Sequence, residues 1–226
     1  MPAIFADGIV IHGGTATVVS PGSLVDIYGT GLADSPLIIS ATPLPPSLNG
    51  VQVTVNGKAA PLYYVSSGLV IFQIPYETSP GPVLVRVVNA KGSSLANSIT
   101  VEQGDPSILT YGSNWAVVQN QDYSVNSATN CAASGEYLIA YLIGSGPLDN
   151  PIPTGSPAPV TPISRETLPT SATIGGVNAP VAFAGMTPST VGLMQVNLQA
   201  PAVPGIQPLQ ITVASHASNQ PSVCIR

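Results

Sequence analysis

The sequence predicts an all-β fold built from two consecutive β-sandwiches. Short apolar segments alternate with period two and are bounded by Gly, Pro, Ser or Asn, as β-strands commonly are. Apolar residues nowhere recur at intervals of three and four over a dozen positions without a Gly or Pro, so we expect no long amphipathic helix. The strand patterns also occur twice in the same order, which indicates two copies of one unit.

The first half contains about seven strand candidates, the number typical of an immunoglobulin-like sandwich of about 100 residues. The clearest is the alternating segment 51–55, which runs into Asn56-Gly57, a strong signal for a two-residue hairpin turn. We expect residues 61–65 to be the returning strand of that hairpin. The other candidates are residues 17–19, 24–28, 70–74, 83–88 and 98–102.

The second half repeats the residue spacings of the first. The segments 22–31 and 135–144 both keep the same intervals between a Gly, a Tyr and a second Gly, and both read as strands that end in a glycine turn. The segments 54–61 and 173–180 share Thr, Gly, Ala and Pro at identical intervals. These matches predict that each half folds as the same β-unit.

We place the boundary between the two domains near Gly104, which gives a first domain of residues 1–104 and a second of residues 105–226. The connecting segment 102–106 is short and polar and ends in a stiff proline. We therefore expect the two domains to be held at a defined angle, because such a linker does not behave as a flexible tether.

Several motifs carry a resemblance to a known family. The segment 21–32, Pro-Gly-Ser-Leu-Val-Asp-Ile-Tyr-Gly-Thr-Gly-Leu, resembles the first core strand of IPT/TIG immunoglobulin-like domains. Together with the segments 54–61, 73–77, 120–127 and 192–201, it resembles the two-repeat C-terminal module of Solibacter-type exported proteins of acidobacteria. This resemblance covers nearly the whole chain and implies two tandem IPT/TIG-like domains at an extracellular or cell-surface location. No activity is assigned to that module, so the resemblance implies no functional residues.

Composition excludes several classes of partner. The chain has five Lys and Arg against ten Asp and Glu, too few cations to neutralise the phosphates of a nucleic acid. The longest apolar run, residues 137–143, is far shorter than the roughly 20 residues of a membrane-spanning helix. The first residues lack the basic and apolar blocks of a signal peptide, so we expect an export signal to have been removed or to lie on a longer parent chain.

The two cysteines, Cys131 and Cys224, both lie in the second half, in its early segment and in its last strand. The first and last strands of such sandwiches are often neighbours, and exported chains oxidise readily, so a disulfide is one interpretation and two buried thiols are the other. We expect no metal site, because His12 and His216 lie in different halves and the two cysteines are the only thiols.

We predict no catalytic and no cofactor-binding residues. His12 and His216 are the only histidines that could serve a serine nucleophile, and neither accompanies a Gly-x-Ser-x-Gly turn. The acids are scattered singly, which disfavours a glycosidase pair. The alternating oxygens of residues 122–126 are typical of calcium loops, but the other loop residues of such a site are absent, and a polar turn explains them more simply.

The leading functional hypothesis is a non-catalytic structural or spacer module of a larger exported protein, outside the cell or at its surface. The first alternative is a binding module for a polysaccharide or a protein partner, which would use the loops 32–46 and 151–162 and stack ligands on Tyr63 and Tyr64. The second alternative is an assembly subunit whose N-terminal segment 4–11 pairs with a sheet edge of another copy.

Two other tyrosines look structural from their sequence positions. Tyr28 and Tyr141 occupy equivalent places in the repeated strands 22–31 and 135–144. We therefore expect both side chains to lie in the core of their sandwich instead of at a ligand site.

Overall fold

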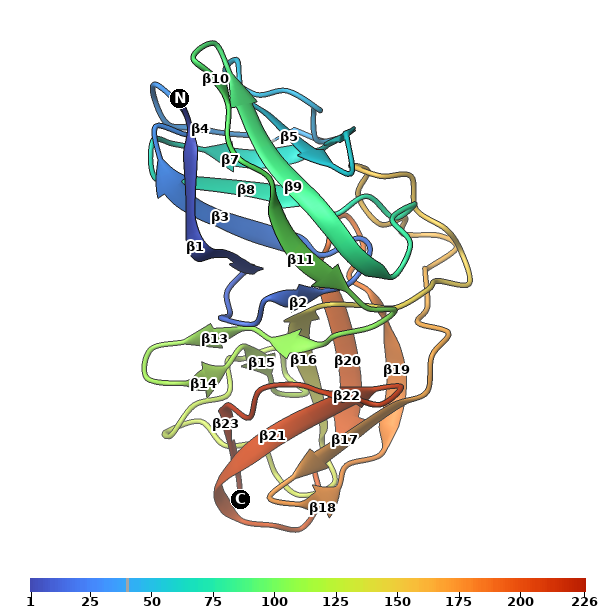
Figure 1. Ribbon diagram of the computed structural model, residues 1–226. Coiled ribbons are helices and arrows are strands. Elements are labelled where there is room, and N and C mark those ends of the chain that lie inside the picture. Colours follow the sequence, from blue (N-terminus) through green and yellow to red (C-terminus); the bar gives the residue numbers. More distant parts are fainter. Residues whose placement is uncertain (40) are drawn as a thin grey trace.

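The computed structural model describes residues 1–39 and 41–226, and every regular element in this part of the chain is a β-strand. The strands form four sheets. Two sheets of the N-terminal half lie above two sheets of the C-terminal half (Figure 1). The predicted fold class, two tandem immunoglobulin-like β-sandwiches, is confirmed.

The first sandwich consists of two sheets. One sheet runs β1 (Ala3–Ile11), β3 (Leu24–Thr30), β8 (Leu69–Gln73), β7 (Leu62–Val65) and β4 (Leu37–Ile38). The other runs β2 (Val18–Val19), β11 (Asn97–Val101), β9 (Gly81–Asn89), β5 (Gln52–Val55) and β6 (Lys58–Ala60), with β10 (Gly92–Ser93) paired to β9. Inward residues alternate with outward ones along these strands, as in β9, and the buried set makes a continuous apolar core.

The second sandwich also pairs two sheets. One contains β12 (Ser107–Ile108), β16 (Tyr137–Ile143), β20 (Met194–Gln199) and β19 (Val181–Met186), with β15 (Val118–Gln119) paired to β16. The other contains β13 (Thr110–Tyr111), β14 (Trp115–Ala116), β23 (Ser222–Ile225), β21 (Gly205–Val213), β17 (Thr170–Ile174) and β18 (Val177–Asn178), with β22 (His216–Ala217) paired to β21. Its buried residues form a second apolar cluster.

The Asn56-Gly57 turn forms as predicted, but the returning strand differs from the sequence prediction. Asn56 and Gly57 both have positive φ, and they join β5 to β6, which pairs back as Val55 with Lys58. The expected partner, residues 61–65, instead belongs to the opposite sheet as β7. Pro61 has no N–H to continue the ladder, so the hairpin ends there and the chain crosses the sandwich.

In the second half, the chain also crosses from one sheet to the other at the equivalent proline. β17 and β18 make the corresponding hairpin, and β19 follows in the other sheet after Pro180. Pro61 O accepts a hydrogen bond from Gln73 N at 2.9 Å, and Pro180 O accepts one from Gln199 N at 2.9 Å. The repeated Ala-Pro motif of the sequence therefore marks the same crossing in both halves.

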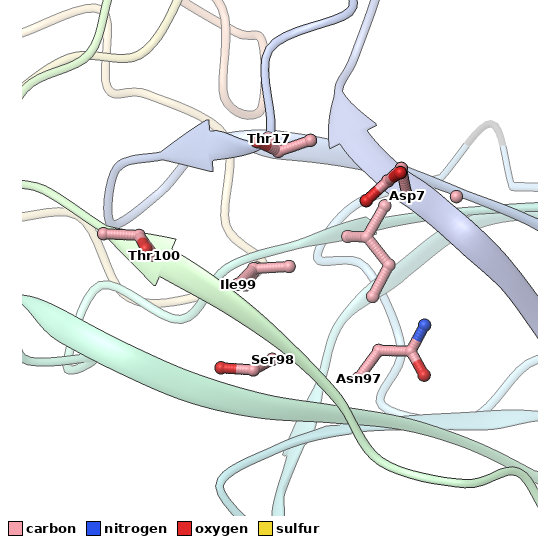
Figure 2. A pocket seen from close by; sticks show the side chains of 8 residues that line it. Asp7, Thr17, Asn97, Ser98, Ile99 and Thr100 are labelled. Atoms are coloured by element: carbon pink, nitrogen blue, oxygen red, sulfur yellow. The ribbon is translucent and has the colours of Figure 1, made fainter.

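The N-terminal strand β1 is the edge strand of its sheet and pairs antiparallel with β3 of its own sandwich. The pairing is interrupted between Ile4 and Ile9, where Asp7 has a φ of 54°. Figure 2 shows a pocket of about 160 Å³ beside this irregularity, between Asp7, Thr17 and the β11 residues 97–100. Pairing of this strand with a second copy stays a prediction.

Candidate functional site

The junction between the sandwiches is closed on one side by residues 151–157, which reach from the second half to the first (Figure 1). Gly155 N donates to Gln73 Oε1 at 2.7 Å, and Gly155 O accepts from Leu44 N at 2.8 Å. Gln73 is fully buried, and its Nε2 donates to Gly22 O at 3.1 Å. One buried amide therefore links the first sandwich to the inserted loop of the second.

Thr154 and Tyr76 make the neighbouring contact. Thr154 Oγ1 accepts from Tyr76 N at 3.0 Å and donates to Glu77 Oε2 at 2.7 Å. The Tyr76 ring packs against the apolar core of the second sandwich, and this burial raises the pKa of its phenol. A Cβ on Gly22 would lie 2.2 Å from this ring, so the close packing requires a glycine there.

The connecting segment between the sandwiches is also fixed. His216 Nδ1 lies 2.5 Å from Gly104 O, and a Cβ on Gly144 would lie 1.9 Å from Asp105 O. Burial raises the pKa of the Asp105 carboxyl, and the nearby His216 opposes that shift. His216 thus helps to position the connecting segment.

The two apolar cores meet at the junction. Ile143 of β16 belongs to the core cluster of the first sandwich, and Leu109 and Leu193 of the second half pack against that cluster. Tyr76 makes the reciprocal contact with the second core. Side chains of each half therefore lie against the interior of the other, in addition to the hydrogen bonds around Gly155.

A cavity of about 360 Å³ lies at this junction and contains one of the expected ligand-stacking residues. Tyr63 lines it together with His12, Leu109 and Leu193. Tyr64, the other expected stacking residue, is half-buried and does not belong to the described lining. A role of either tyrosine in ligand binding stays a prediction.

His12 is oriented by a carboxylate at the edge of the junction cavity. Its Nδ1 lies 2.7 Å from Asp26 Oδ1, and Asp26 is buried. Ser189, an exposed residue, lines the same cavity. In the part of the chain that the structure describes, no hydrogen bond joins a serine hydroxyl to His12. The contact between His12 and Asp26 ties the end of β1 to β3.

The cysteines of the second sandwich are joined in a disulfide, with Cys131 Sγ and Cys224 Sγ 1.98 Å apart. Asn126 supports the same connection, and sequence reasoning did not predict a structural role for it. Its Oδ1 accepts from Cys224 N at 2.8 Å, its Nδ2 donates to Cys224 O at 3.0 Å, and its side chain is buried. The signal that could have identified Asn126 is its place in a long polar segment just before a cysteine.

The segment 122–126 is a polar turn. Asp122 Oδ1 accepts hydrogen bonds from Ser124 N at 3.0 Å and from Ser124 Oγ at 2.5 Å. These bonds lower the pKa of the Asp122 carboxyl. Among the residues that the structure describes, no group of three or more His, Cys, Asp or Glu side chains gathers in a way that could hold a metal ion.

The predicted core positions of Tyr28 and Tyr141 are wrong. Tyr28 is 42% exposed and Tyr141 is half-buried. Side chains alternate between the two faces of a strand, and the core face of β16 is taken by Ala140 and Leu142, so Tyr141 lies on the other face. Tyr28, after buried Ile27, is placed outward in the same way.

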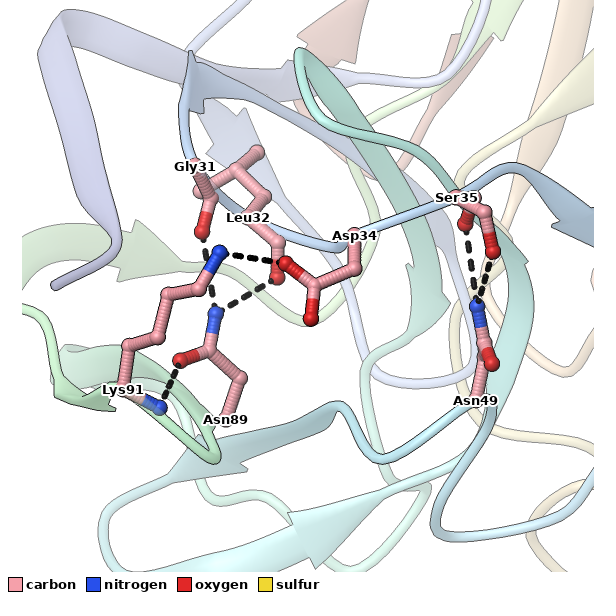
Figure 3. Close-up of polar contacts among 7 residues, drawn as sticks. All are labelled: Gly31, Leu32, Asp34, Ser35, Asn49, Asn89 and Lys91. Atoms are coloured by element: carbon pink, nitrogen blue, oxygen red, sulfur yellow. Dashed lines mark hydrogen bonds and ion pairs between the residues drawn. The ribbon is translucent and has the colours of Figure 1, made fainter.

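The loops expected to bind ligands have different surroundings. The loop 151–162 packs against the first sandwich at Gly155, as described above, and so contributes to the junction. Ser40, within the loop 32–46, lies outside the described residues. Figure 3 shows how the start of that loop is held: Asn89 Nδ2 donates to Gly31 O at 2.9 Å and to Leu32 O at 3.0 Å.

An exposed ion pair stands beside this contact, at the end of the first sandwich remote from the second. Lys91 Nζ pairs with Asp34 Oδ1 (Figure 3). Both side chains are exposed, and surface pairs of this kind contribute little to stability. We therefore attribute the position of the segment after β3 mainly to the hydrogen bonds of the Asn89 side-chain amide.

A larger groove of about 640 Å³ lies on the second sandwich and shares Leu109 and Leu193 with the junction cavity. Its lining includes Tyr111 and Tyr141. The sequence predicts a core position for Tyr141, so this groove is a feature that the sequence did not predict. In the described part of the chain, no helix is long and apolar enough to cross a membrane.

One protein-family model matches a segment that lies within the first sandwich. Residues 14–103 match the IPT/TIG domain family. The finer resemblance, to the two-repeat module of Solibacter-type exported proteins, stays a prediction. No curated protein sequence matches the chain.

Several solved structures are similar at low sequence identity. SGBP-B of the mixed-linkage glucan utilization locus of Bacteroides ovatus, in complex with a mixed-linkage heptasaccharide, is 14% identical with a TM-score of 0.41, over 100% of this chain and 47% of that one. SGBP-B from a complex xyloglucan utilization locus of Bacteroides uniformis is 14% identical with a TM-score of 0.30, over 100% and 49%. The extracellular region of plexin A4 is 10% identical with a TM-score of 0.34, over 100% and 18%. The chain thus spans about half the length of the two SGBP-B structures, and we draw no functional argument from likenesses this distant.

Proposed function

We propose that the chain is a non-catalytic structural module of a larger exported protein, which acts as a spacer that keeps its two ends at a fixed separation. The observation that carries this proposal is the attachment of residues 154 and 155 to the first sandwich through Gln73, Tyr76 and Leu44. A chain of two sandwiches joined only by a linker would bend freely, since small interfaces between domains permit relative motion.

Three independent contacts support a rigid junction. The inserted loop is hydrogen-bonded to buried Gln73, the connecting segment is held at Gly104 by His216, and Ile143 enters the core of the first sandwich. These contacts lie on different elements, so bending at the junction would have to break all of them together. Such an arrangement suits a spacer better than a hinge.

An extracellular or cell-surface location is part of the proposal. Disulfide bonds form and persist in oxidising compartments, and the chain carries the pair Cys131–Cys224 with no free cysteine in the described residues. Immunoglobulin-like sandwiches recur as structural and binding modules of cell-surface proteins. The match of residues 14–103 to the IPT/TIG family is consistent with a role of this kind.

Residual dipolar couplings and small-angle X-ray scattering on the whole chain test the spacer role. We expect one alignment tensor to describe both sandwiches. Weakening the loop attachment with Thr154→Ala combined with Gln73→Ala should make the fit of both sandwiches to one tensor poorer and broaden the distribution of interdomain angles, while the other two contacts remain. Thr129→Ala, an exposed threonine of the second sandwich, is the matched control and should leave the single tensor intact. Two separate tensors in the unaltered chain would refute the proposal.

The second candidate function is that of a binding module for a polysaccharide or a protein. The observation that favours it is the pair of adjoining cavities, of about 360 and about 640 Å³, both of which contain tyrosine side chains. A spacer requires no such surface. The two functions are compatible, because the contacts that make the junction rigid leave the larger groove open on the second sandwich.

A further inference from the structure

We infer that the groove on the second sandwich binds an extended, neutral polysaccharide chain. The inference rests on the binding function proposed as the second candidate and is independent of the spacer role. The groove is formed by β13, β15 and β16 together with Val125 and Leu193, and none of the loops first expected to bind ligands contributes to it.

The two tyrosines of the groove are held in place by their hydroxyl groups. Tyr111 Oη donates to Asn126 O at 2.7 Å, and Tyr141 Oη donates to Gln119 Oε1 at 2.7 Å. Gln119 Nε2 in turn donates to Tyr123 O at 3.1 Å. Rings fixed in this way lose little rotational freedom when a ligand stacks on them, which favours binding.

Aliphatic side chains complete the lining, and they give the ligand an apolar contact surface. Val125 is 55% exposed and Tyr111 is 37% exposed, so part of this surface remains in contact with solvent. Tyrosine rings contact the C–H faces of sugar rings well, since they present an apolar face and a polar edge. A tyrosine phenol is neutral near pH 7 at its ordinary pKa, and burial raises the pKa of the Tyr141 phenol further.

The outer face of β16 and β20 extends the groove as a row of tyrosines and amides. Tyr141 pairs directly with Gln195 across the two strands, and Tyr137, 46% exposed, pairs with Gln199. Asn197 lies between the two glutamines on the same face. At roughly 3.3 Å per residue, the two tyrosine–glutamine pairs are about 13 Å apart, which suits several linked sugars better than one.

The charge of this surface selects the kind of ligand. No Asp, Glu, Lys or Arg belongs to the described lining of the groove, and none stands in the row of cross-strand pairs. Within the groove, an anionic or cationic ligand would leave a charge without a partner, which is costly. Amide side chains both donate and accept hydrogen bonds, so they match sugar hydroxyls, and the rings match sugar C–H groups. A wholly apolar ligand would leave the amides unused.

Affinity gel electrophoresis and isothermal titration calorimetry test the inference with three soluble neutral polysaccharides: a β-glucan, a galactomannan and a dextran. Polygalacturonate serves as the anionic comparison. We expect at least one neutral polysaccharide to slow the migration of the protein in the gel and to give a binding signal in calorimetry. Polygalacturonate should give neither effect. Tyr141→Ala and Tyr111→Ala should each raise the Kd by about tenfold or more, because each removes a stacking surface.

Tyr28→Ala is the matched control, because it removes an exposed tyrosine from the first sandwich and should leave binding unchanged. Val125→Asp covers the case in which a tyrosine variant fails to fold, since it adds a charge to the groove at an exposed position. Circular dichroism and a thermal melt verify folding of each variant.

Three results would overturn the inference: no binding of any neutral polysaccharide, neutral binding that is unaffected by Tyr141→Ala and Val125→Asp, or preferential binding of polygalacturonate. Capture of a protein or peptide segment in the groove, competing with the polysaccharide at equal affinity, would also count against it. The alignment tensors of these variants report on the spacer role separately, so failure of one idea does not imply failure of the other.

Discussion

The two sandwiches share the order of their main strands but fasten their irregular segments in different ways. The first sandwich holds the loop after β3 with the amide of Asn89. The second inserts longer segments between β15 and β16 and between β16 and β17, and it holds the former with the disulfide Cys131–Cys224 and with buried Asn126. The comparison teaches that a repeated strand scaffold tolerates insertions where each insertion brings its own anchor.

Of the variants that test this difference, removal of the disulfide should have the largest effect on stability. Cys131→Ser combined with Cys224→Ser should lower the free energy of unfolding of the second sandwich by up to about 4.7 kcal/mol, the chain-entropy limit for closing a loop near 100 residues. The first sandwich has no cysteine and should keep its stability. Hydrogen exchange resolved along the chain measures both effects, and reduction of the unaltered protein provides the control. Equal loss of protection in the two sandwiches would contradict the comparison.

Equivalent core positions test whether each sandwich depends on its own interior. Phe72 of β8 and Leu198 of β20 precede the repeated glutamines Gln73 and Gln199, and both side chains are fully buried. Phe72→Ala should cost about 4 kcal/mol and Leu198→Ala about 3 kcal/mol, each mainly in its own sandwich. Denaturant unfolding followed by residue-resolved exchange measures this. One shared transition affected equally by both variants would indicate a single cooperative unit instead.

A substitution of Asn126 tests the hydrogen bonds that hold Cys224 while leaving the disulfide intact. Asn126→Ala leaves Cys224 N and Cys224 O without their side-chain partner in a buried place, so we expect a loss of about 2–3 kcal/mol. Asn97→Ala is the matched control in the first sandwich. Its amide makes only a long contact, 3.5 Å to Phe5 O, and its removal should cost well under about 1 kcal/mol. Equal losses in the thermal melts of the two variants would show that Asn126 is no special anchor.

The smallest expected effect belongs to Asp105, in the segment that joins the sandwiches. Burial raises the pKa of its carboxyl, so the folded chain holds that proton at a higher pH than the unfolded chain does. The unfavourable carboxylate is therefore present at neutral pH, and it is relieved as the pH falls through the folded pKa. Asp105→Asn should stabilise the protein slightly at pH 7 and give no gain at a pH below the ordinary aspartate pKa. Urea denaturation at the two pH values measures the difference, and a larger gain at the lower pH would reverse the assigned sign.

Local signals in the sequence predicted the β-architecture and the turn at Asn56-Gly57, because both depend on neighbouring residues. The predicted returning strand of that hairpin, residues 61–65, is one strand later than the observed one, β6. The sequence does not show that the chain crosses the sandwich at Pro61. The repeated spacing of Ala-Pro could have indicated the crossing, because it recurs at Pro180.

The candidate site was less accessible to sequence reasoning. Tyr63 was named and lines the junction cavity, whereas Tyr141 was assigned to the core from its equivalence to Tyr28. That equivalence was correct, but both tyrosines face outward. The groove itself joins residues of β13, β15 and β16 with Leu193, and such a juxtaposition is set by sheet pairing across the chain instead of by any local pattern.

The close approaches at Gly22 and Gly144 give the junction an unusual kind of sensitivity. A methyl group at Gly144 would overlap the Asp105 carbonyl, and one at Gly22 would overlap the Tyr76 ring. The junction therefore contains two places where a hydrogen atom fits and a methyl group does not. Replacing these glycines with residues of increasing size would change the interdomain angle in steps. A series of such variants would show how the function of this protein depends on that angle.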